Sequence, residues 1–292
     1  MTKLSKILTI RIKILAISLF LAGCAASGDK RATDDVGPVT AYARNTLAQE
    51  NPQGLVRIGE GFERARDFVG ARKLYAQAMA AAPDLADAKI AYARVSSALG
   101  QNDAATAVLT LLLRDKPDNR AAKTALAQVY TAARRYAAAL KVLDGLPQPT
   151  GRELMLIGQL LHVTGAGDEG QRRLTEALDK SPDDSAVLEA AALSFALNSD
   201  YPAAVALLRR AMDQRSASDV AQKSLALVYA LSGQRQAALR LARDIMSVNE
   251  VQQMEAFYRF LPKFSKQEQA AALFFNRVPT DTVKRLSGDA TK

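Results

Sequence analysis

Apolar residues recur along most of this chain with the spacing of amphipathic helices. Between about residues 52 and 252 they fall three or four positions apart, which places them on one face of a helix. Gly100, Gly165 and Gly233 lie between neighbouring helical segments, where a residue of positive φ can end a helix. The pattern predicts an all-α protein made of helical hairpins.

The hairpins repeat with a period of about 34 residues, a length typical of repeats built from two helices. Pro83 and Pro117 lie one period apart, and Pro182 follows at a distance of two periods less three residues. The shorter unit ends near residues 146–149. The chain therefore divides into six units, at residues 52–85, 86–119, 120–150, 151–184, 185–218 and 219–252.

Three positions of each unit carry mostly small residues, which allow two helices to approach each other closely. Across the six units these positions read Gly59, Ala71 and Ala78; Ala93, Ala105 and Leu112; Ala127, Ala139 and Leu146; Gly158, Gly170 and Ala177; Ala192, Ala204 and Ala211; and Ala226, Ala238 and Ile245. Asp84, Asp118 and Asp183 follow the prolines and are expected to cap the next helices. The pattern resembles the tetratricopeptide repeat. The resemblance implies a right-handed superhelical solenoid over residues 39–252, with a short leading helix near residues 39–49.

Residues 253–292 depart from the repeat and are rich in aromatic residues. They hold six of the 17 Phe and Tyr residues of the chain. Ser265 and Glu268 form the capping-box pattern that opens a helix through residues 270–276. Because a solenoid must cover its last exposed face, we expect capping helices here. A partner-docking patch is the alternative.

The first helix of each unit is expected to line the concave face of the solenoid, a surface suited to an extended or helical peptide. The predicted lining residues are Val56, Glu60, Glu63, Ile90, Arg94, Thr124, Gln128, Met155, Gln159, His162, Glu189, Leu193, Lys223 and Leu227. This set becomes more apolar toward the C-terminal units, which favours an amphipathic partner segment. Capture of a C-terminal carboxylate is not expected, because Lys and Asn are not placed as in the family's carboxylate clamps.

The first 23 residues have the organisation of a bacterial signal peptide. A basic stretch precedes an apolar run over residues 14–22. As a helix this run would cover about 14 Å, roughly half of a bilayer core and too short for a permanent span. Residues 21–24, Leu-Ala-Gly-Cys, match the lipobox of bacterial lipoproteins, which implies cleavage before Cys24 and acylation of its thiol.

The predicted lipid places the mature chain on a membrane, because two or three acyl chains anchor a protein firmly. Residues 24–38 are mostly small or charged and are expected to form a flexible tether. In enterobacterial sorting, an Asp directly after the lipidated Cys retains a lipoprotein at the inner membrane. Ala25 stands at that position here. The resemblance therefore implies the outer membrane, with the protein facing the periplasm.

Charge and composition argue against several functions. The net charge of +9 falls to +5 for a chain that starts at Cys24, because four basic residues and no acidic residue precede it. This excess is spread along the chain without interleaved aromatic residues, so no nucleic-acid partner is expected. Cys24 is the only Cys, which excludes a disulfide within the chain. No cofactor, metal site or small-molecule substrate is indicated.

Two features that could suggest catalysis have structural explanations. Residues 165–170 match the glycine fingerprint of dinucleotide-binding proteins, but that motif needs a preceding strand, and residues 154–163 have the helical period. His162 is the only His, which excludes a zinc-binding His pair, and lipidation of Cys24 excludes a Cys–His pair. We interpret His162 as a solvated residue of the groove. No enzymatic activity is expected.

The combination of lipobox, short tether and about six repeats resembles TadD, the repeat lipoprotein family of Tad/Flp pilus assembly, and more distantly the pilotin lipoproteins of type IV pili. The resemblance rests on architecture and size, since no short motif defines the family. It implies a non-enzymatic scaffold that helps a secretin channel assemble or reach its place in the outer membrane. The alternative is a cell-envelope scaffold for peptidoglycan enzymes or for the outer-membrane protein insertion machinery.

Overall fold

The computed structural model describes residues 51–213, 218–278 and 281–282, and the regular secondary structure of these residues is entirely helical. The predicted signal peptide (residues 1–23), tether (24–38) and leading helix (39–49) lie outside the described residues. None of the described helices is both long enough and apolar enough to cross a bilayer.

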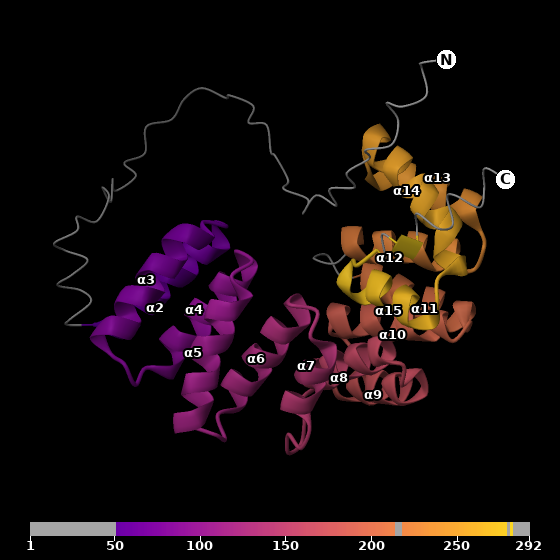
Figure 1. The fold of residues 1–292 in the computed structure, drawn as a ribbon. Coiled ribbons are helices and arrows are strands. Elements are labelled where there is room, and N and C mark those ends of the chain that lie inside the picture. The colour runs from indigo at the N-terminus through magenta and orange to yellow at the C-terminus, as the bar shows by residue number, and fades with distance from the viewer. Residues whose placement is uncertain (1–50, 214–217, 279–280, 283–292) are drawn as a thin grey trace, which may run out of the picture. The chain divides into compact units, whose positions relative to one another are not determined.

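The helices pair into hairpins in which a second helix packs against the first (Figure 1). In chain order the pairs are α2 (Pro52–Arg64) with α3 (Phe68–Ala81), α4 (Ala86–Ala98) with α5 (Asn102–Asp115), α6 (Arg120–Ala132) with α7 (Tyr136–Leu143), α8 (Gly151–Thr164) with α9 (Gly167–Lys180), α10 (Ser185–Leu197) with α11 (Tyr201–Met212), and α12 (Ser218–Leu231) with α13 (Arg235–Ile245). Each second helix also packs against the first helix of the next hairpin. The predicted tetratricopeptide solenoid is confirmed.

Each of these hairpins turns through one residue of positive φ. The turn residues are Arg66, Gly100, Arg134, Gly165, Ser199 and Gly233, with φ between 60° and 99°. Their spacing equals the repeat period, except that it is three residues shorter across the third unit, which confirms the predicted register. Three of the turns place a residue with a side chain in the left-handed region, at a cost of about 1–2 kcal/mol each.

The small positions lie where two helices touch. Ala71, Ala139 and Ala204 are fully buried. α8 and α9 approach each other closely, since a Cβ added to Gly158 would lie 2.8 Å from the carbonyl oxygen of Gly170. Only glycine fits at these two positions without movement of the backbone, so the small residues determine how closely the paired helices pack.

The residues that cap these helices lie one position later than predicted. Asn119 and Asp184, rather than Asp118 and Asp183, are the N-cap residues, and their side chains accept hydrogen bonds from backbone N–H groups of α6 and α10. The residue before α4 is Leu85, which provides no side-chain cap, so the prediction for Asp84 is also wrong. A capping side chain must directly precede the first helical turn to reach its free N–H groups.

The third unit interrupts the stack. Its second helix, α7, has only 8 residues, and two prolines follow within the linker to α8. First helices contact one another from α2 to α4 to α6, and from α8 to α10 to α12. Among the described helices, no comparable contact joins α6 to α8. The first-helix surface is therefore divided into an N-terminal and a C-terminal part.

The helices of the C-terminal segment pack against two different parts of the solenoid. α14 (Val248–Phe260) packs against α12 and α13, and the short helix η1 (Leu261–Lys263) packs against α12 and α14. In contrast, α15 (Lys266–Phe275) turns back along the chain and packs against α8 and α10 (Figure 1). The predicted boundary at residue 253 falls inside α14, because a Ser247–Glu250 capping box starts that helix earlier. The predicted capping box at Ser265 is confirmed.

Candidate partner-binding groove

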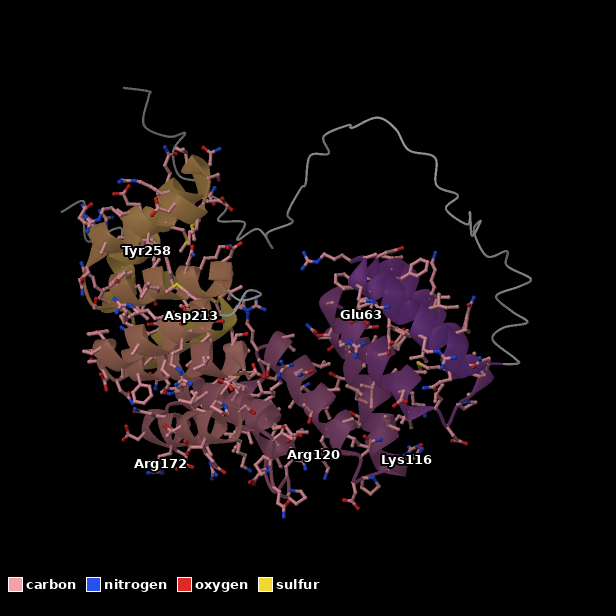
Figure 2. All side chains as sticks on the ribbon, turned by 180° about the vertical axis from the view of Figure 1, so that it is seen from behind. Glu63, Lys116, Arg120, Arg172, Asp213 and Tyr258 are labelled. Carbon is pink, nitrogen blue, oxygen red and sulfur yellow. The ribbon has the colours of Figure 1, made fainter. Side chains whose placement is uncertain are left out.

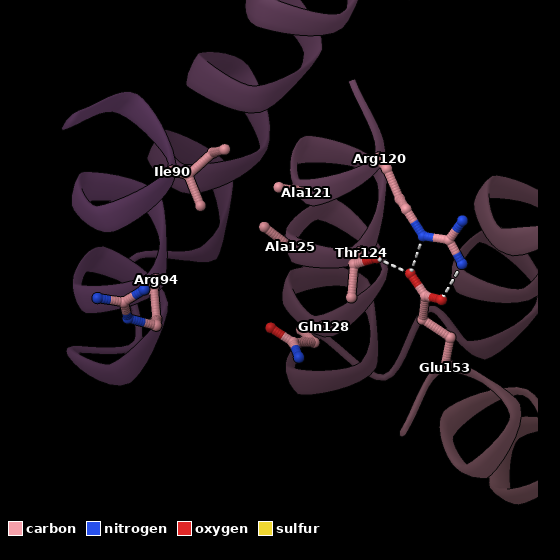
Figure 3. Close-up of a pocket in the computed structure, with 8 residues that line it drawn as sticks. All are labelled: Ile90, Arg94, Arg120, Ala121, Thr124, Ala125, Gln128 and Glu153. Atoms are coloured by element: carbon pink, nitrogen blue, oxygen red, sulfur yellow. Dashed lines mark hydrogen bonds and ion pairs between the residues drawn. The ribbon is translucent and has the colours of Figure 1, made fainter. Parts of the chain in front are cut away.

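A groove opens between the first helices of the second and third units, α4 and α6 (Figure 3). Its volume is about 450 Å³, and its lining residues are Ile90, Arg94, Arg120, Ala121, Thr124, Ala125, Gln128 and Glu153. Thr124, Ala125 and Gln128 lie three, four and seven positions after Ala121, so a single face of α6 forms one side of the groove. Ile90 and Arg94 come from the facing side of α4.

An ion pair between α2 and α4 borders the groove at Arg94. The Arg94 guanidinium donates from Nε to Glu63 Oε1 and from Nη2 to Glu63 Oε2, both at 2.7 Å. The Tyr75 hydroxyl donates to Glu63 Oε2 at 2.9 Å. The hydrogen bonds from Arg94 hold the pKa of Glu63 below its ordinary value. Burial, together with the neighbouring carboxylate, raises the pKa of Tyr75.

A second ion pair, between α6 and α8, borders the opposite side (Figure 3). Arg120 Nε donates to Glu153 Oε1 at 2.8 Å, and Arg120 Nη2 donates to Glu153 Oε2. The hydroxyl of Thr124 donates to Oε1 at 3.1 Å, and the backbone N–H of Thr150 donates to Oε2 at 2.7 Å. The Arg120 guanidinium is the main reason why the pKa of Glu153 is lowered to about 2. The carboxylate is therefore buried but fully hydrogen-bonded.

Between these two ion pairs the groove has a neutral floor. Ile90, Ala121 and Ala125 supply aliphatic surface, and Gln128 adds an exposed amide at the edge. Both bordering guanidinium groups already bind carboxylates, so an anionic ligand would have to compete with Glu63 or Glu153. Glu63 and Arg120, one residue of each ion pair, are labelled in Figure 2. The groove suits the apolar side of a short helix.

The C-terminal part of the first-helix surface is covered by the chain itself. The ring of Phe274 in α15 lies 5.5 Å from the ring of His162 in α8. The ring of Phe275 stacks on that of Tyr136, the first residue of α7, at 5.3 Å. Both distances are typical of aromatic pairs. Helix α15 therefore occupies the region where the sequence predicted an open groove.

His162 is not a solvated groove residue, so that interpretation is wrong. Its side chain is only 5% exposed, because the ring lies between Gly170 of α9 and Phe274 of α15. Its Nε2 lies 2.7 Å from Ser194 Oγ. Burial lowers the pKa of His162 to about 4. A His can activate a Ser hydroxyl, but Ser194 is fully buried, so a substrate cannot reach this pair.

The structure brings four of the predicted lining residues together in the open groove, namely Ile90, Arg94, Thr124 and Gln128. Glu63 borders it through Arg94. Three predicted residues, Val56, His162 and Leu193, are buried. Of the others, Glu60 is exposed, while Met155, Gln159, Glu189, Lys223 and Leu227 are half-buried.

Leu193 and Glu189 show why the C-terminal predictions differ from the observed surface. Leu193 is 3% exposed and belongs to the main hydrophobic core. Glu189 accepts a hydrogen bond from Ser224, and burial raises its pKa. Ser224 lies in α12, so the Glu189 side chain is used in a contact between neighbouring first helices, whereas Leu193 is used in the core.

Sequence reasoning missed Arg120, Ala121, Ala125 and Glu153. Ala121 and Ala125 neighbour Thr124 on the same helix face, so helical spacing could have found them. The pairing of Arg120 with Glu153 depends on the shortened third unit and has no signal in the repeat pattern. Within the described residues, no group of three His, Cys, Asp or Glu side chains could hold a metal ion.

Comparisons with known proteins agree with this architecture. A family model described as tetratricopeptide repeat matches residues 64–125, from the end of α2 into α6. A comparison with the curated proteins finds no significant match. The fold thus rests on the geometry and on solved structures more than on sequence similarity.

Three solved structures share the fold at low identity. The structure of pilF from Pseudomonas aeruginosa is 16% identical, with 73% of this chain and 99% of that chain covered and a TM-score of 0.56. A tetratricopeptide repeat protein from Parabacteroides merdae is 14% identical, with 80% and 96% covered and a TM-score of 0.58. A chain of the APC/C hetero-tetramer Cut9–Hcn1 is 15% identical, with 83% and 44% covered and a TM-score of 0.60. At these identities the similarity shows the fold alone.

Proposed function

We propose that this protein is a lipid-anchored scaffold on the periplasmic face of the outer membrane, and that it binds a helical segment of a protein partner between α4 and α6. The observation that carries the proposal is the open groove of about 450 Å³ with its neutral aliphatic floor. An amphipathic helix can lay its apolar face into such a groove. The corresponding surface of α8 and α10 is already covered by α15.

Acylation of Cys24 would decide where this groove acts. A lipid anchor confines the groove to one membrane face and raises the effective concentration of a membrane-bound partner. A groove of this size contacts few side chains, and association costs several kcal/mol before any contact is gained. Tethering therefore allows even weak contacts in the groove to hold a membrane-bound partner.

The partner that we propose is the secretin channel of a Tad/Flp pilus or another component of that machine. Support comes from the lipobox at residues 21–24, the short tether and the six repeats, which together resemble TadD. The solenoid supplies an extended binding surface. Such a protein would act by holding a partner in place.

The groove can be tested with two matched substitutions, Ala121→Asp and Ala137→Asp. Both alanines are exposed, and each is the second residue of its helix, α6 or α7, so the new carboxylate has the same effect on helix stability. Only Ala121 lines the groove. Deleting the gene should reduce secretin multimers and abolish pili. The native gene and Ala137→Asp should restore both, whereas Ala121→Asp should not, although its circular dichroism and melting temperature are unchanged.

The outcomes separate the parts of this proposal. Full rescue by Ala121→Asp would show that partners do not use this groove. Normal secretin multimers and pili in the deletion strain, with altered septation or peptidoglycan, would replace the pilus function by a general cell-envelope scaffold. A Cys24→Ser variant should lose palmitate labelling and leave the membrane fraction. Labelling that persists in this variant would contradict the lipid anchor.

A further inference from the structure

Helix α15 has a position that capping of the solenoid does not explain. α14 and η1 already pack against the last hairpin, α12 and α13. α15 lies one and two hairpins earlier, on the first helices α10 and α8 (Figure 1). These are the helices whose exposed side forms the binding surface in a solenoid of this type. The chain therefore places a helix of its own where a ligand helix would bind.

The apolar side of α15 forms this contact. Ala270, Ala272 and Leu273 are buried, and small residues allow the helix to lie close to the surface below it. Phe274 and Phe275 follow directly and diverge, one toward the ring of His162 and the other onto the ring of Tyr136. Two adjacent aromatic residues thus contact two different helices, α8 and α7.

Polar contacts at both ends of α15 fix its position on the surface of α8 and α10. Lys266, at its start, donates to the carbonyl oxygen of Leu197 at the end of α10. Beyond its end, Arg277 donates to the carbonyl oxygen of Ala132 at the end of α6, at 3.4 Å. Free carbonyl groups at helix ends are ready acceptors for such cations. The segment also spans the interruption between the third and fourth units.

We propose that the surface formed by α8 and α10, with Tyr136 at its edge, is a second helix-binding site, which α15 fills as an internal ligand and which a partner helix of the same chemistry occupies when α15 is displaced. The partner helix would carry a side of small residues that ends in two adjacent aromatic residues. The inference rests on the proposed function only in taking a protein segment as the ligand. The groove between α4 and α6 is a separate site.

Exchange at this site is physically reasonable, because α15 is an addition to the solenoid and not a member of a hairpin. An isolated helix of 10 residues is marginal in water, so undocked α15 retains little structure to compete with its docked state. A tethered segment competes through its effective concentration. The apparent affinity of a partner falls by the fraction of molecules in which the site is free. Weakening the docking of α15 should therefore strengthen binding of an added helix.

The test uses a labelled synthetic peptide of residues 264–278 and the full chain with Phe274→Ser and Phe275→Ser. Fluorescence anisotropy should show that this variant binds the peptide at least about tenfold more tightly than the native chain does. His162 is the only His of the chain, so its ring signals in NMR report on the site without interference. Adding the peptide should move these signals from their position in the variant toward their position in the native chain.

Two controls accompany this measurement. A peptide in which both Phe residues are Ser should not bind. The full chain with Phe62→Ser, which changes a 41% exposed aromatic residue of α2, should behave like the native chain. Failure of the native peptide to bind the folded double variant would overturn the proposal.

Hydrogen exchange on the native chain tests, without any substitution, whether α15 can detach from α8 and α10. The amides of α15 should exchange through an opening that leaves α8 and α10 protected. Exchange of α15 only together with α8 and α10 would show that it is a permanent part of the core and would overturn the proposal, even if the double variant fails to fold. The result is independent of Ala121→Asp, because Ala121 lies in the other groove.

Discussion

The guanidinium of Arg120 in α6 binds the carboxylate of Glu153 in α8, and this pair joins the two parts of the first-helix surface. Arg120 also donates hydrogen bonds to the carbonyl oxygens of Pro147 and Gln148, at 2.8 and 3.0 Å. These two residues belong to the linker that follows the short helix α7. The Arg120 side chain therefore joins α6, this linker and α8.

Arg120→Ala should destabilise the protein more than loss of an exposed ion pair would, because it leaves the buried carboxylate of Glu153 without its ionic partner. Arg152→Ala is the matched control. Arg152 directly precedes Glu153 and pairs with Asp184 at 2.7 Å, but its side chain is 74% exposed. An exposed pair contributes at most about 1 kcal/mol. Urea denaturation should separate the two variants, and equal midpoints would contradict the structural role of Arg120.

His162 should make the protein less stable in mild acid. Burial lowers its pKa to about 4, with Lys266 acting in the same direction and Asp168 in the opposite one. The unfolded chain, with a His pKa near 6.5, binds the proton more readily. Stability that is present above about pH 6.5 is therefore lost as the pH falls toward 4, by about 2 kcal/mol between pH 7.5 and 5.

Two measurements check this pH dependence. His162→Asn removes the titrating group, so its free energy of unfolding should change less between pH 7.5 and 5 than that of the native chain. An NMR titration of the single His gives its pKa directly. A value near 6.5 in the folded chain would show that the ring is not buried in solution.

Replacing glycine by alanine should change the stability in opposite directions at Gly158 and Gly61. A Cβ at Gly158 would lie 2.6 Å from Leu174 Cγ and 2.8 Å from the carbonyl oxygen of Gly170, so Gly158→Ala should destabilise by about 1–3 kcal/mol. A Cβ at Gly61 in α2 would meet only the guanidinium end of Arg64, at 3.9 Å. Gly61→Ala should therefore stabilise by up to about 1 kcal/mol, since alanine favours the helix. Melting temperatures that shift in the same direction would contradict this packing.

The hairpin turns offer a reciprocal pair of substitutions. Ser199 and Gly100 occupy equivalent turns, are both exposed and have φ of 67° and 79°. Ser199→Gly should stabilise the protein by up to about 1 kcal/mol, because it removes a side chain from the left-handed region. Gly100→Ser should destabilise it by a similar amount. Thermal unfolding of both variants tests the prediction, which fails if the two shifts have the same sign.

The hairpins and their register followed from the sequence alone. The residues that decide them, such as Ala71, Ala204 and the turn glycines, act within one hairpin or between adjacent hairpins. Contacts of this kind recur once in every repeat, so the periodicity of the chain reveals them. The same reasoning located Ile90, Arg94, Thr124 and Gln128 in the groove, because helical spacing determines which face of a first helix points away from its partner.

Only the tertiary structure decided which surface α15 packs against. The sequence identifies Phe274 and Phe275 as apolar residues of a capped helix, but both the last hairpin and an earlier one offer an apolar surface to such a helix. The contact between Arg277 and Ala132 joins residues 145 positions apart, outside any period of the repeat. Which surface is chosen depends on how well shapes and polar groups match at that distance along the chain. That choice covers His162 and leaves the groove between α4 and α6 open.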